Sequence, residues 1–231
     1  MIIHGLYKLT LLDYPEHIAC TIFTGGCNFR CPFCHNASLV THINPATLLP
    51  QEEILSFLNK RVGILEGVCI SGGEPTLQPD LIEFIKKIKN LGFLVKLDTN
   101  GSNPSMLAEL LDQNLLDYVA MDIKNSPTNY GKTIGLATYD LSNINASIEL
   151  LKHASIDYEF RTTVVKELHT EDDFFQIAKW IPNCSHYFLQ TFVDSKDLIQ
   201  DGFTGYNKEE MTSFANLLRP WIPNVAVRGI E

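Results

Sequence analysis

Short runs rich in apolar and β-branched residues alternate along the chain with segments of helical periodicity. The apolar runs predict strands at residues 18–23, 67–70, 93–98, 117–122, 156–165 and 185–190. Between and after these runs, apolar residues recur at the three- and four-residue spacing of one helix face: Ile54 and Leu58; Leu81, Ile85 and Ile88; Leu107, Leu110 and Leu111; Ile144, Ile148 and Leu151; Phe174, Ile177 and Ile181; Met211, Phe214 and Leu218. Six strand–helix repeats predict an α/β fold of parallel strands with helices on the outside.

Polar motifs stand at the carboxyl ends of these strands. A cysteine loop follows the first strand and residues 71–75 (Ser-Gly-Gly-Glu-Pro) follow the second. Residues 98–101 close the third, residues 122–124 close the fourth, and Arg161 lies on the fifth. Because the loops after parallel strands meet on one face of a βα barrel, we predict a partial, laterally open (βα)6 TIM-like barrel, with residues 1–231 as a single domain. A flavodoxin-like open sheet is the alternative.

Three cysteines, Cys27, Cys31 and Cys34, lie in one short loop with the spacing C-x3-C-x2-C. Thiolates hold iron–sulfur clusters, and a four-iron cluster with three protein ligands leaves one iron for a ligand that is not protein. A structural zinc site that also uses His35 is an alternative. A disulfide framework is disfavoured, because six cysteines in 231 residues is a low density and no signal peptide is recognisable. The remaining cysteines are expected to be buried, unpaired thiols: Cys20, Cys69 and Cys184.

Composition and charge narrow the function classes. The chain is 45% hydrophobic and 19% charged, as in an ordinary globular protein. Its formal net charge of −9 argues against a nucleic-acid partner, which needs a basic face. No apolar run approaches the ~20 residues of a membrane span, so we expect no membrane partner and a cytoplasmic protein.

Each motif also has a chemistry of its own. Gly72-Gly73 lets the backbone approach a ligand closely, and a plain strand-to-helix turn is the alternative explanation. Glu74 offers a carboxylate to an ammonium group, and Asp98-Thr99-Asn100 offers acceptors to ribose hydroxyls or a cation. Asp122 and Lys124 share one face of a strand. Inside a barrel this pair must serve a polar ligand, and on the outside it would be an ordinary surface pair.

Together these residues resemble the motifs of the radical S-adenosylmethionine (SAM) superfamily, namely the cysteine loop with Phe33 before its last cysteine, followed by Gly-Gly-Glu-Pro at 72–75. Within it, Cys34-His35-Asn36, Asp-Thr-Asn-Gly at 98–101 and Asp-x-Lys at 122–124 resemble the glycyl-radical-enzyme activases. Further segments are similar to the anaerobic ribonucleoside-triphosphate reductase activating proteins: residues 5–6, 12–15, 25–31, 160–164 and 227–229.

The resemblance implies a [4Fe–4S] cluster on Cys27, Cys31 and Cys34, with SAM on the fourth iron. It also implies a set of SAM contacts: Gly72, Gly73 and Glu74 at the methionine amine; Phe33 and His35 beside the adenine; Asp122 and Lys124 at the ribose and carboxylate; Asp98 and Thr99 near the same ligand or a monovalent cation; and Asn100 and Arg161 completing the set. Such an enzyme receives an electron from a flavodoxin- or ferredoxin-type donor and cleaves SAM. It then forms a glycyl radical on a partner, here an anaerobic ribonucleotide reductase.

Two features depart from the pyruvate formate-lyase activases. Those enzymes carry a histidine near the end of the sixth strand, where this chain reads Leu-Gln-Thr-Phe-Val at 189–193, so the last SAM contact is left open. The 32 residues between Cys34 and Gly67 hold no cysteine, which excludes a ferredoxin-like insert and favours the compact reductase-type subgroup. A radical SAM enzyme acting on a small molecule or peptide is the alternative function. A zinc-stabilised binding module, from a different class, leaves the motifs after the other strands unexplained.

Overall fold

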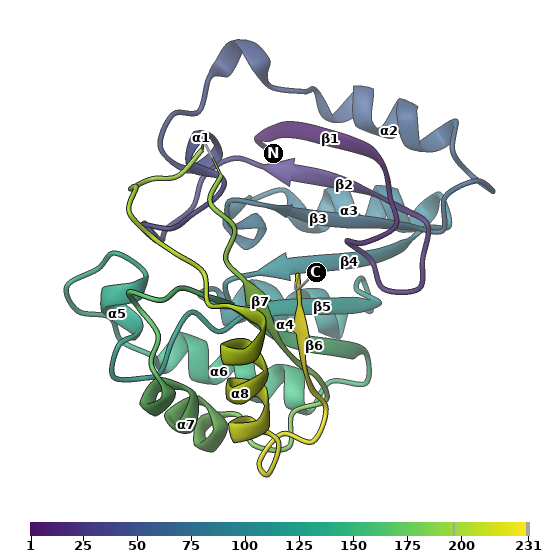
Figure 1. Cartoon of the computed structure of the whole chain (residues 1–231). Helices are drawn as coiled ribbons and strands as arrows, with labels where there is room; N and C mark the ends of the chain where they lie inside the picture. Colours follow the sequence, from purple (N-terminus) through teal and green to yellow (C-terminus); the bar gives the residue numbers. More distant parts are fainter. Residues whose placement is uncertain (196, 230–231) are drawn as a thin grey trace.

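The computed structural model describes residues 1–195 and 197–229, in which eight strands form one sheet in the order β1 to β8. The strand β1 (Ile3–Thr10) runs antiparallel to its neighbour, and every later pair is parallel. The other strands are β2 (Ala19–Thr24), β3 (Gly67–Gly72), β4 (Leu94–Thr99), β5 (Tyr118–Asp122), β6 (Asp157–Val164), β7 (Tyr187–Thr191) and β8 (Val225–Arg228). Figure 1 shows the strands turning in direction from β1 to β8, so that the sheet is curved.

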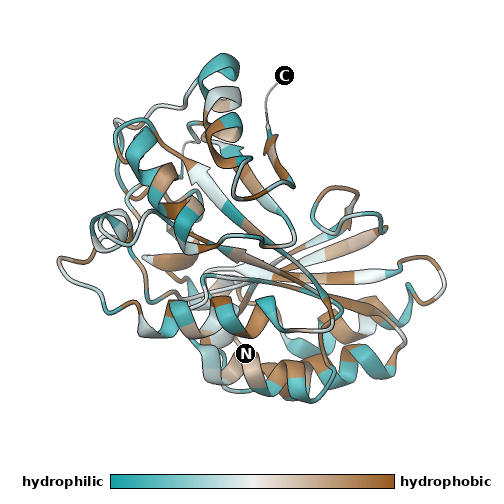
Figure 2. Cartoon of the chain, turned by 90° about the horizontal axis from the view of Figure 1, so that it is seen from below, coloured by the Kyte–Doolittle hydropathy of each residue, from teal (hydrophilic) through white to brown (hydrophobic). Residues whose placement is uncertain are grey.

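Helices lie between the strands in the chain, and the longer ones cover the outside of the sheet (Figure 1). They are α1 (Ala37–Val40), α2 (Gln51–Asn59), α3 (Leu81–Asn90), α4 (Pro104–Asp112), α5 (Tyr130–Thr133), α6 (Ser142–Lys152), α7 (Glu171–Trp180) and α8 (Lys208–Leu218). In α3 the predicted face of Leu81, Ile85 and Ile88 is buried, whereas Glu83 and Lys87 are exposed. Figure 2 shows this mixture of hydrophobic and hydrophilic positions in the helices. Burial of one apolar face per helix therefore fixes the outer layer.

The predicted α/β fold with an open, parallel sheet is confirmed, and each of the six predicted runs forms a strand. The structure adds two strands, so seven run parallel where six were predicted. β8 has only four residues, too few for an alternating pattern to stand out. β1 lies at an edge, where Tyr7 and Leu9 are 64% and 63% exposed. Within the described residues no pairing joins β1 to β8, so the sheet is open between its two edge strands.

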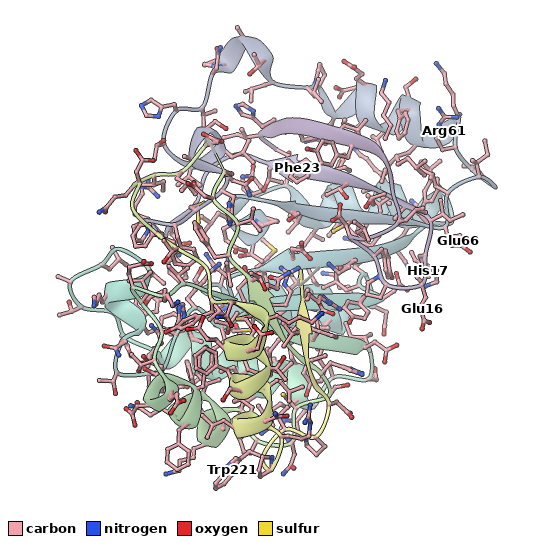
Figure 3. The ribbon with its side chains drawn as sticks, in the orientation of Figure 1. Glu16, His17, Phe23, Arg61, Glu66 and Trp221 are labelled. Atoms are coloured by element: carbon pink, nitrogen blue, oxygen red, sulfur yellow. The ribbon has the colours of Figure 1, made fainter. Side chains whose placement is uncertain are left out.

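The parallel order places the carboxyl ends of β2 to β8 at one rim of the sheet. The opposite rim is formed by the amino ends, where Glu16, His17 and Glu66 lie in Figure 3. There His17 Nδ1 lies 3.5 Å from Glu66 Oε2. One cluster of buried residues extends along the chain from Ile3 to Val225. In the part of the chain that the structure describes, no helix is both long and apolar enough to cross a membrane.

Candidate active site

A cavity of about 220 Å³ lies at the rim formed by the carboxyl ends of the parallel strands. Its wall contains every predicted site residue except Glu74: Cys27, Cys31, Phe33, Cys34, His35, Gly72, Gly73, Asp98, Thr99, Asn100, Asp122, Lys124 and Arg161. The wall also contains residues that were not predicted: Phe29, Asn36, Val40, Ser71, Thr163 and Gln190. Side chains from six segments of the chain therefore converge on one cavity.

Gly72 and Gly73 bring the end of β3 against the cysteine loop. A Cβ on Gly73 would lie 2.1 Å from the carbonyl oxygen of Gly26, closer than any side chain tolerates. The Glu74 N–H donates to that same oxygen over 2.8 Å. Gly72 has a φ of 114°, and a Cβ there would lie 2.4 Å from the backbone of Thr24. The glycine pair is therefore required for close contact between two loops, beyond the needs of a plain turn.

The cysteine loop is held by hydrogen bonds to its own backbone and to the segment after β5. The Arg30 N–H donates to the carbonyl oxygen of Ile134 over 2.9 Å, and Arg30 Nη1 donates to the carbonyl oxygen of Cys27 over 2.6 Å. Burial raises the pKa of the Cys31 thiol to about 12, and the ammonium group of Lys124 acts against that shift. Because thiolates bind metals, metal uptake at this loop would release protons.

The thiols of this loop line one cavity without meeting at one point. Among the described residues, no three His, Cys, Asp or Glu side chains converge closely enough to hold a single ion. A four-coordinate zinc requires such convergence, whereas each iron of a cubane takes one thiolate, so its cysteines stand around a cavity. The arrangement of Cys27, Cys31 and Cys34 fits a cluster better than a zinc ion. The other cysteines are buried, as predicted: Cys20, Cys69 and Cys184.

Five charged side chains alternate in sign from the interior of the sheet to the cavity. Lys96 contacts Asp98. Arg161 lies between the two carboxylates, with Nη1 3.4 Å from Asp98 Oδ2 and Nε 3.1 Å from Asp122 Oδ1. Lys124 Nζ lies 2.9 Å from Asp122 Oδ2. Three cations and two carboxylates leave one positive charge in excess, which favours an anionic group on a bound ligand.

The pKa values in this row follow from the pairing of its charges. Burial alone would raise the pKa of Asp98, but Arg161 and Lys96 outweigh burial and lower the pKa to about 2. Burial also acts to raise the pKa of Asp122, and Lys124 and Arg161 again prevail and lower it. The pKa of Lys124 is raised, because Asp122 outweighs its burial. Asp98, Asp122 and Lys124 are therefore charged at neutral pH.

Asp122 and Lys124 line the cavity, so of the two alternatives the structure has the interior placement and not the surface pair. In the register of the sheet Asp122 pairs with Arg161, which places both side chains on one face. Lys96, which supports Asp98 and is 2% exposed, was not predicted. The sequence could have indicated it, because Lys96 alternates along β4 with Val95 and Leu97, which are buried on the other face, and therefore shares a face with Asp98.

Glu74 differs from its predicted role. Its carboxylate is completely buried below the cavity wall and accepts four hydrogen bonds. The donors are Thr76 N–H (3.0 Å), Thr76 Oγ1 (2.6 Å), Thr99 Oγ1 (2.8 Å) and Asn100 N–H (2.6 Å). Burial raises the pKa of the Glu74 carboxyl, although these donors act in the opposite direction. Because it is completely buried and already accepts four hydrogen bonds from the loops after β3 and β4, Glu74 joins these loops and does not reach the cavity to receive an ammonium group.

The segment after β7 completes the cavity. Gln190 lies in the wall at the place where the sequence left the last ligand contact open, and it pairs in register with Thr163 of β6. His35 stacks on Phe192 with a ring-centroid distance of 5.1 Å, and burial lowers the pKa of His35. Figure 1 shows the chain after β7 running towards α1, and there the Gln200 N–H donates to the carbonyl oxygen of Pro32 over 2.9 Å.

The chain is similar in sequence and fold to known proteins. Residues 21–181 match the family model described as the radical SAM superfamily. A protein of Methanocaldococcus jannaschii with the provisional name glycyl-radical enzyme activating enzyme is 34% identical over 238 residues, which cover 100% of this chain and 97% of the relative. The pyruvate formate-lyase-activating enzyme of Clostridium pasteurianum is 34% identical over 128 residues, or 53% of this chain and 52% of that enzyme.

A solved structure shows the likeness of fold. Streptococcus suis SuiB bound to S-adenosylmethionine matches 88% of this chain with a TM-score of 0.70 at 12% sequence identity, and the match covers 48% of SuiB. The chain thus spans almost the whole of the archaeal relative and about half of the other two proteins. With the family model matched over residues 21–181 and one relative matched over 97% of its length, the chain belongs to the radical SAM superfamily.

Proposed function

We propose that this protein is a radical SAM activase, which cleaves SAM reductively and generates a glycyl radical on a partner enzyme. The observation that carries the proposal is one cavity in which three cysteines face polar residues from five strands, β3 to β7. Similarity over the full chain to a protein named as a glycyl-radical enzyme activating enzyme supports the activase role.

In this proposal Cys27, Cys31 and Cys34 hold a [4Fe–4S] cluster, which when bound supplies the electron for SAM cleavage. The protein's part is to bind SAM in one orientation. The backbone at Gly72-Gly73 approaches the methionine amine, because neither residue has a side chain in the way. Phe33 lies in the same wall and, with His35 beside it, supplies a flat apolar surface for the adenine.

The charged row supplies the polar contacts. Lys124 and Arg161 attract the methionine carboxylate, and Asp122 between them accepts from the ribose hydroxyls. Gln190 takes the place of the sixth-strand histidine as the last contact. A monovalent cation near Asp98 and Thr99 stays a prediction, and their existing hydrogen bonds would compete with it.

We propose an anaerobic ribonucleoside-triphosphate reductase as the partner. The segments that resemble the reductase activating proteins include residues 5–6 and 227–229, which belong to or adjoin the edge strands β1 and β8 that border the lateral opening. Tyr7 and Leu9 are largely exposed on β1, and exposed apolar side chains at an opening suit a protein partner. A low-potential flavodoxin- or ferredoxin-type donor and a cytoplasmic location belong to the same proposal.

The test is electron paramagnetic resonance (EPR) of a mixture of anaerobically reconstituted protein, SAM, reductant and candidate reductase. We expect a glycyl radical signal that requires every component and is lost with Cys31→Ala. Deuterium from Cα-labelled glycine in the reductase should appear in 5′-deoxyadenosine. SAM cleavage that ignores every candidate reductase and responds to a small metabolite would overturn the activase proposal in favour of the small-molecule alternative.

A further inference from the structure

Asn100 contacts one of the three cysteines that line the cavity. It lies in the loop after β4, is 5% exposed, and places its amide nitrogen 3.8 Å from Cys27 Sγ. The same nitrogen donates to Asn28 Oδ1 over 3.0 Å, and Asn100 Oδ1 accepts from the Ser102 N–H over 2.9 Å. Because the oxygen is occupied by a backbone donor, the two amide protons point towards Asn28 and the cysteine sulfur.

The backbone on either side fixes Asn100 in this position. Its own N–H donates to Glu74 Oε2 over 2.6 Å, and the carbonyl oxygen of Gly101 accepts from Ser147 Oγ over 2.7 Å. Asn28 is bound in turn by Ser102 Oγ, which accepts from Asn28 Nδ2 over 2.9 Å. The amide is thus held from the loop after β4 and from the cysteine loop itself.

Cys27 differs from the other two cysteines in its polar contacts. Its sulfur receives two donors, the Asn100 amide and the Phe29 N–H at 3.4 Å. Among the described residues, no hydrogen-bond donor reaches the sulfur of Cys31 or Cys34, for which Lys124 supplies a nearby charge instead. The donors at Cys27 are neutral and directional, and one of them is a replaceable side chain.

We propose that Asn100 is a positioning residue for the cluster, whose amide donates to the Cys27 thiolate and raises the reduction potential of the bound [4Fe–4S] group. This inference rests on the proposed function, since it takes Cys27 as a cluster ligand. A reduced cluster carries one more negative charge than an oxidised one, so a donor to its thiolate stabilises the reduced form more strongly. Asn100 therefore acts on the sulfur in addition to lining the cavity.

The experiment is an anaerobic redox titration of the reconstituted protein without SAM or partner. The EPR signal of the reduced cluster is measured at each solution potential. Asn100→Leu removes the donor and keeps the side-chain volume similar. At a fixed solution potential we expect the ratio of reduced to oxidised cluster to fall about three- to tenfold, the range for one net hydrogen bond. Asn100→Gln, which retains an amide, should recover part of the loss.

Two further variants keep the result interpretable. Asn28→Ala leaves the Asn100 side chain in place but removes its oxygen partner, so a smaller shift in the same direction is expected. Asn103→Ala is the matched control, because Asn103 donates to the carbonyl oxygen of Thr76 over 2.8 Å and caps α4 without touching a cysteine. The ratio is normalised to cluster content, so a variant that binds less iron is still measurable.

An unchanged ratio in both Asn100→Leu and Asn28→Ala, or an equal shift in Asn103→Ala, would overturn the proposal. Because neither SAM nor the partner is present, the outcome is separate from that of the proposed function. If the variants shift the reduction potential as expected but the parent protein never cleaves SAM, the activase role is refuted and the role of Asn100 is retained.

Discussion

Glu74→Gln tests whether this residue binds a ligand or holds two loops together. Oε1 accepts from Thr76 N–H, Thr76 Oγ1 and Thr99 Oγ1, and Oε2 accepts from the Asn100 N–H. Glutamine keeps one oxygen and places an NH2 group at the position of the other. If that group faces Asn100, two donors oppose each other in a completely buried site. If the amide turns over, the hydroxyls of Thr76 and Thr99 can rotate to accept from its NH2 group, but the Thr76 N–H then opposes that group.

The magnitude follows from the better of these orientations. The variant loses one charge-assisted hydrogen bond, worth about 1.5–3 kcal/mol, and leaves a buried donor unsatisfied at a cost of about 1–3 kcal/mol. These terms overlap, so we expect the free energy of unfolding to fall by about 3 kcal/mol. In a domain of this size each kcal/mol lowers Tm by about 2–4 °C, so Tm should drop by roughly 6–12 °C.

The assay is thermal and urea unfolding of the metal-free protein, with parent and variant prepared identically. Glu83→Gln is the matched control, because Glu83 is an exposed glutamate in α3 with one ion pair to Lys86, and its loss should cost at most about 0.5 kcal/mol. A ligand-binding role for Glu74 predicts the reverse pattern, in which stability is unchanged and SAM affinity falls. A Tm within about 1 °C of the parent would refute the structural role.

Three further predictions concern the wall of the cavity. Cys31→Ala should abolish iron uptake, whereas Cys184→Ala in the core should keep it near normal; full iron content in the first variant, by iron and sulfide assay, would contradict the cluster assignment. Lys124→Ala should weaken SAM binding roughly ten- to a hundredfold, the loss of one charge-assisted contact, while Lys132→Ala at the exposed surface of α5 should not, as checked by equilibrium dialysis. Although burial acts to raise the pKa of Asp98, neighbouring cations lower it from 3.8 to about 2, so its contribution to stability is present above pH ~4 and is lost as the pH falls towards 2. Asp98→Asn should therefore show a shallower pH dependence of urea unfolding between about pH 2 and 4, and parallel curves for parent and variant would contradict this.

The sequence predicts most of the cavity wall because a parallel sheet brings the carboxyl ends of its strands to one rim. Once residues 27–34, 71–75, 98–101 and 122–124 are placed after successive parallel strands, they must meet at one rim whatever the details of packing. Apolar runs locate the six central strands, because each of these strands packs against other parts of the protein on both faces. The edge strands β1 and β8 lack that constraint, and β8 is too short to show a pattern.

What the sequence does not supply is the direction of each polar side chain within a motif. Lys96 lies in an apolar strand, and its ion pair with Asp98 in the structure is what shows that it supports that carboxylate from within. Gln190 occupies a place where the resemblance leads one to expect histidine, and only the cavity wall shows that it faces the site. Which side chains face the cavity depends on their contacts with other strands, and those strands are distant in the chain.

The contrast between Glu74 and Asp122 shows why a motif alone cannot separate two kinds of residue. Both are carboxylates just after or at the end of a buried strand, and both are expected from the sequence to contact a ligand. Glu74 is completely buried and meets four donors from its own and the neighbouring loop, whereas Asp122 meets only cations that also line the cavity. The first holds the loops in register before any ligand binds, and the second can exchange its partners for those of a ligand. A functional motif can therefore contain residues that bind and residues that position, and their chemistry differs although their pattern in the sequence is the same.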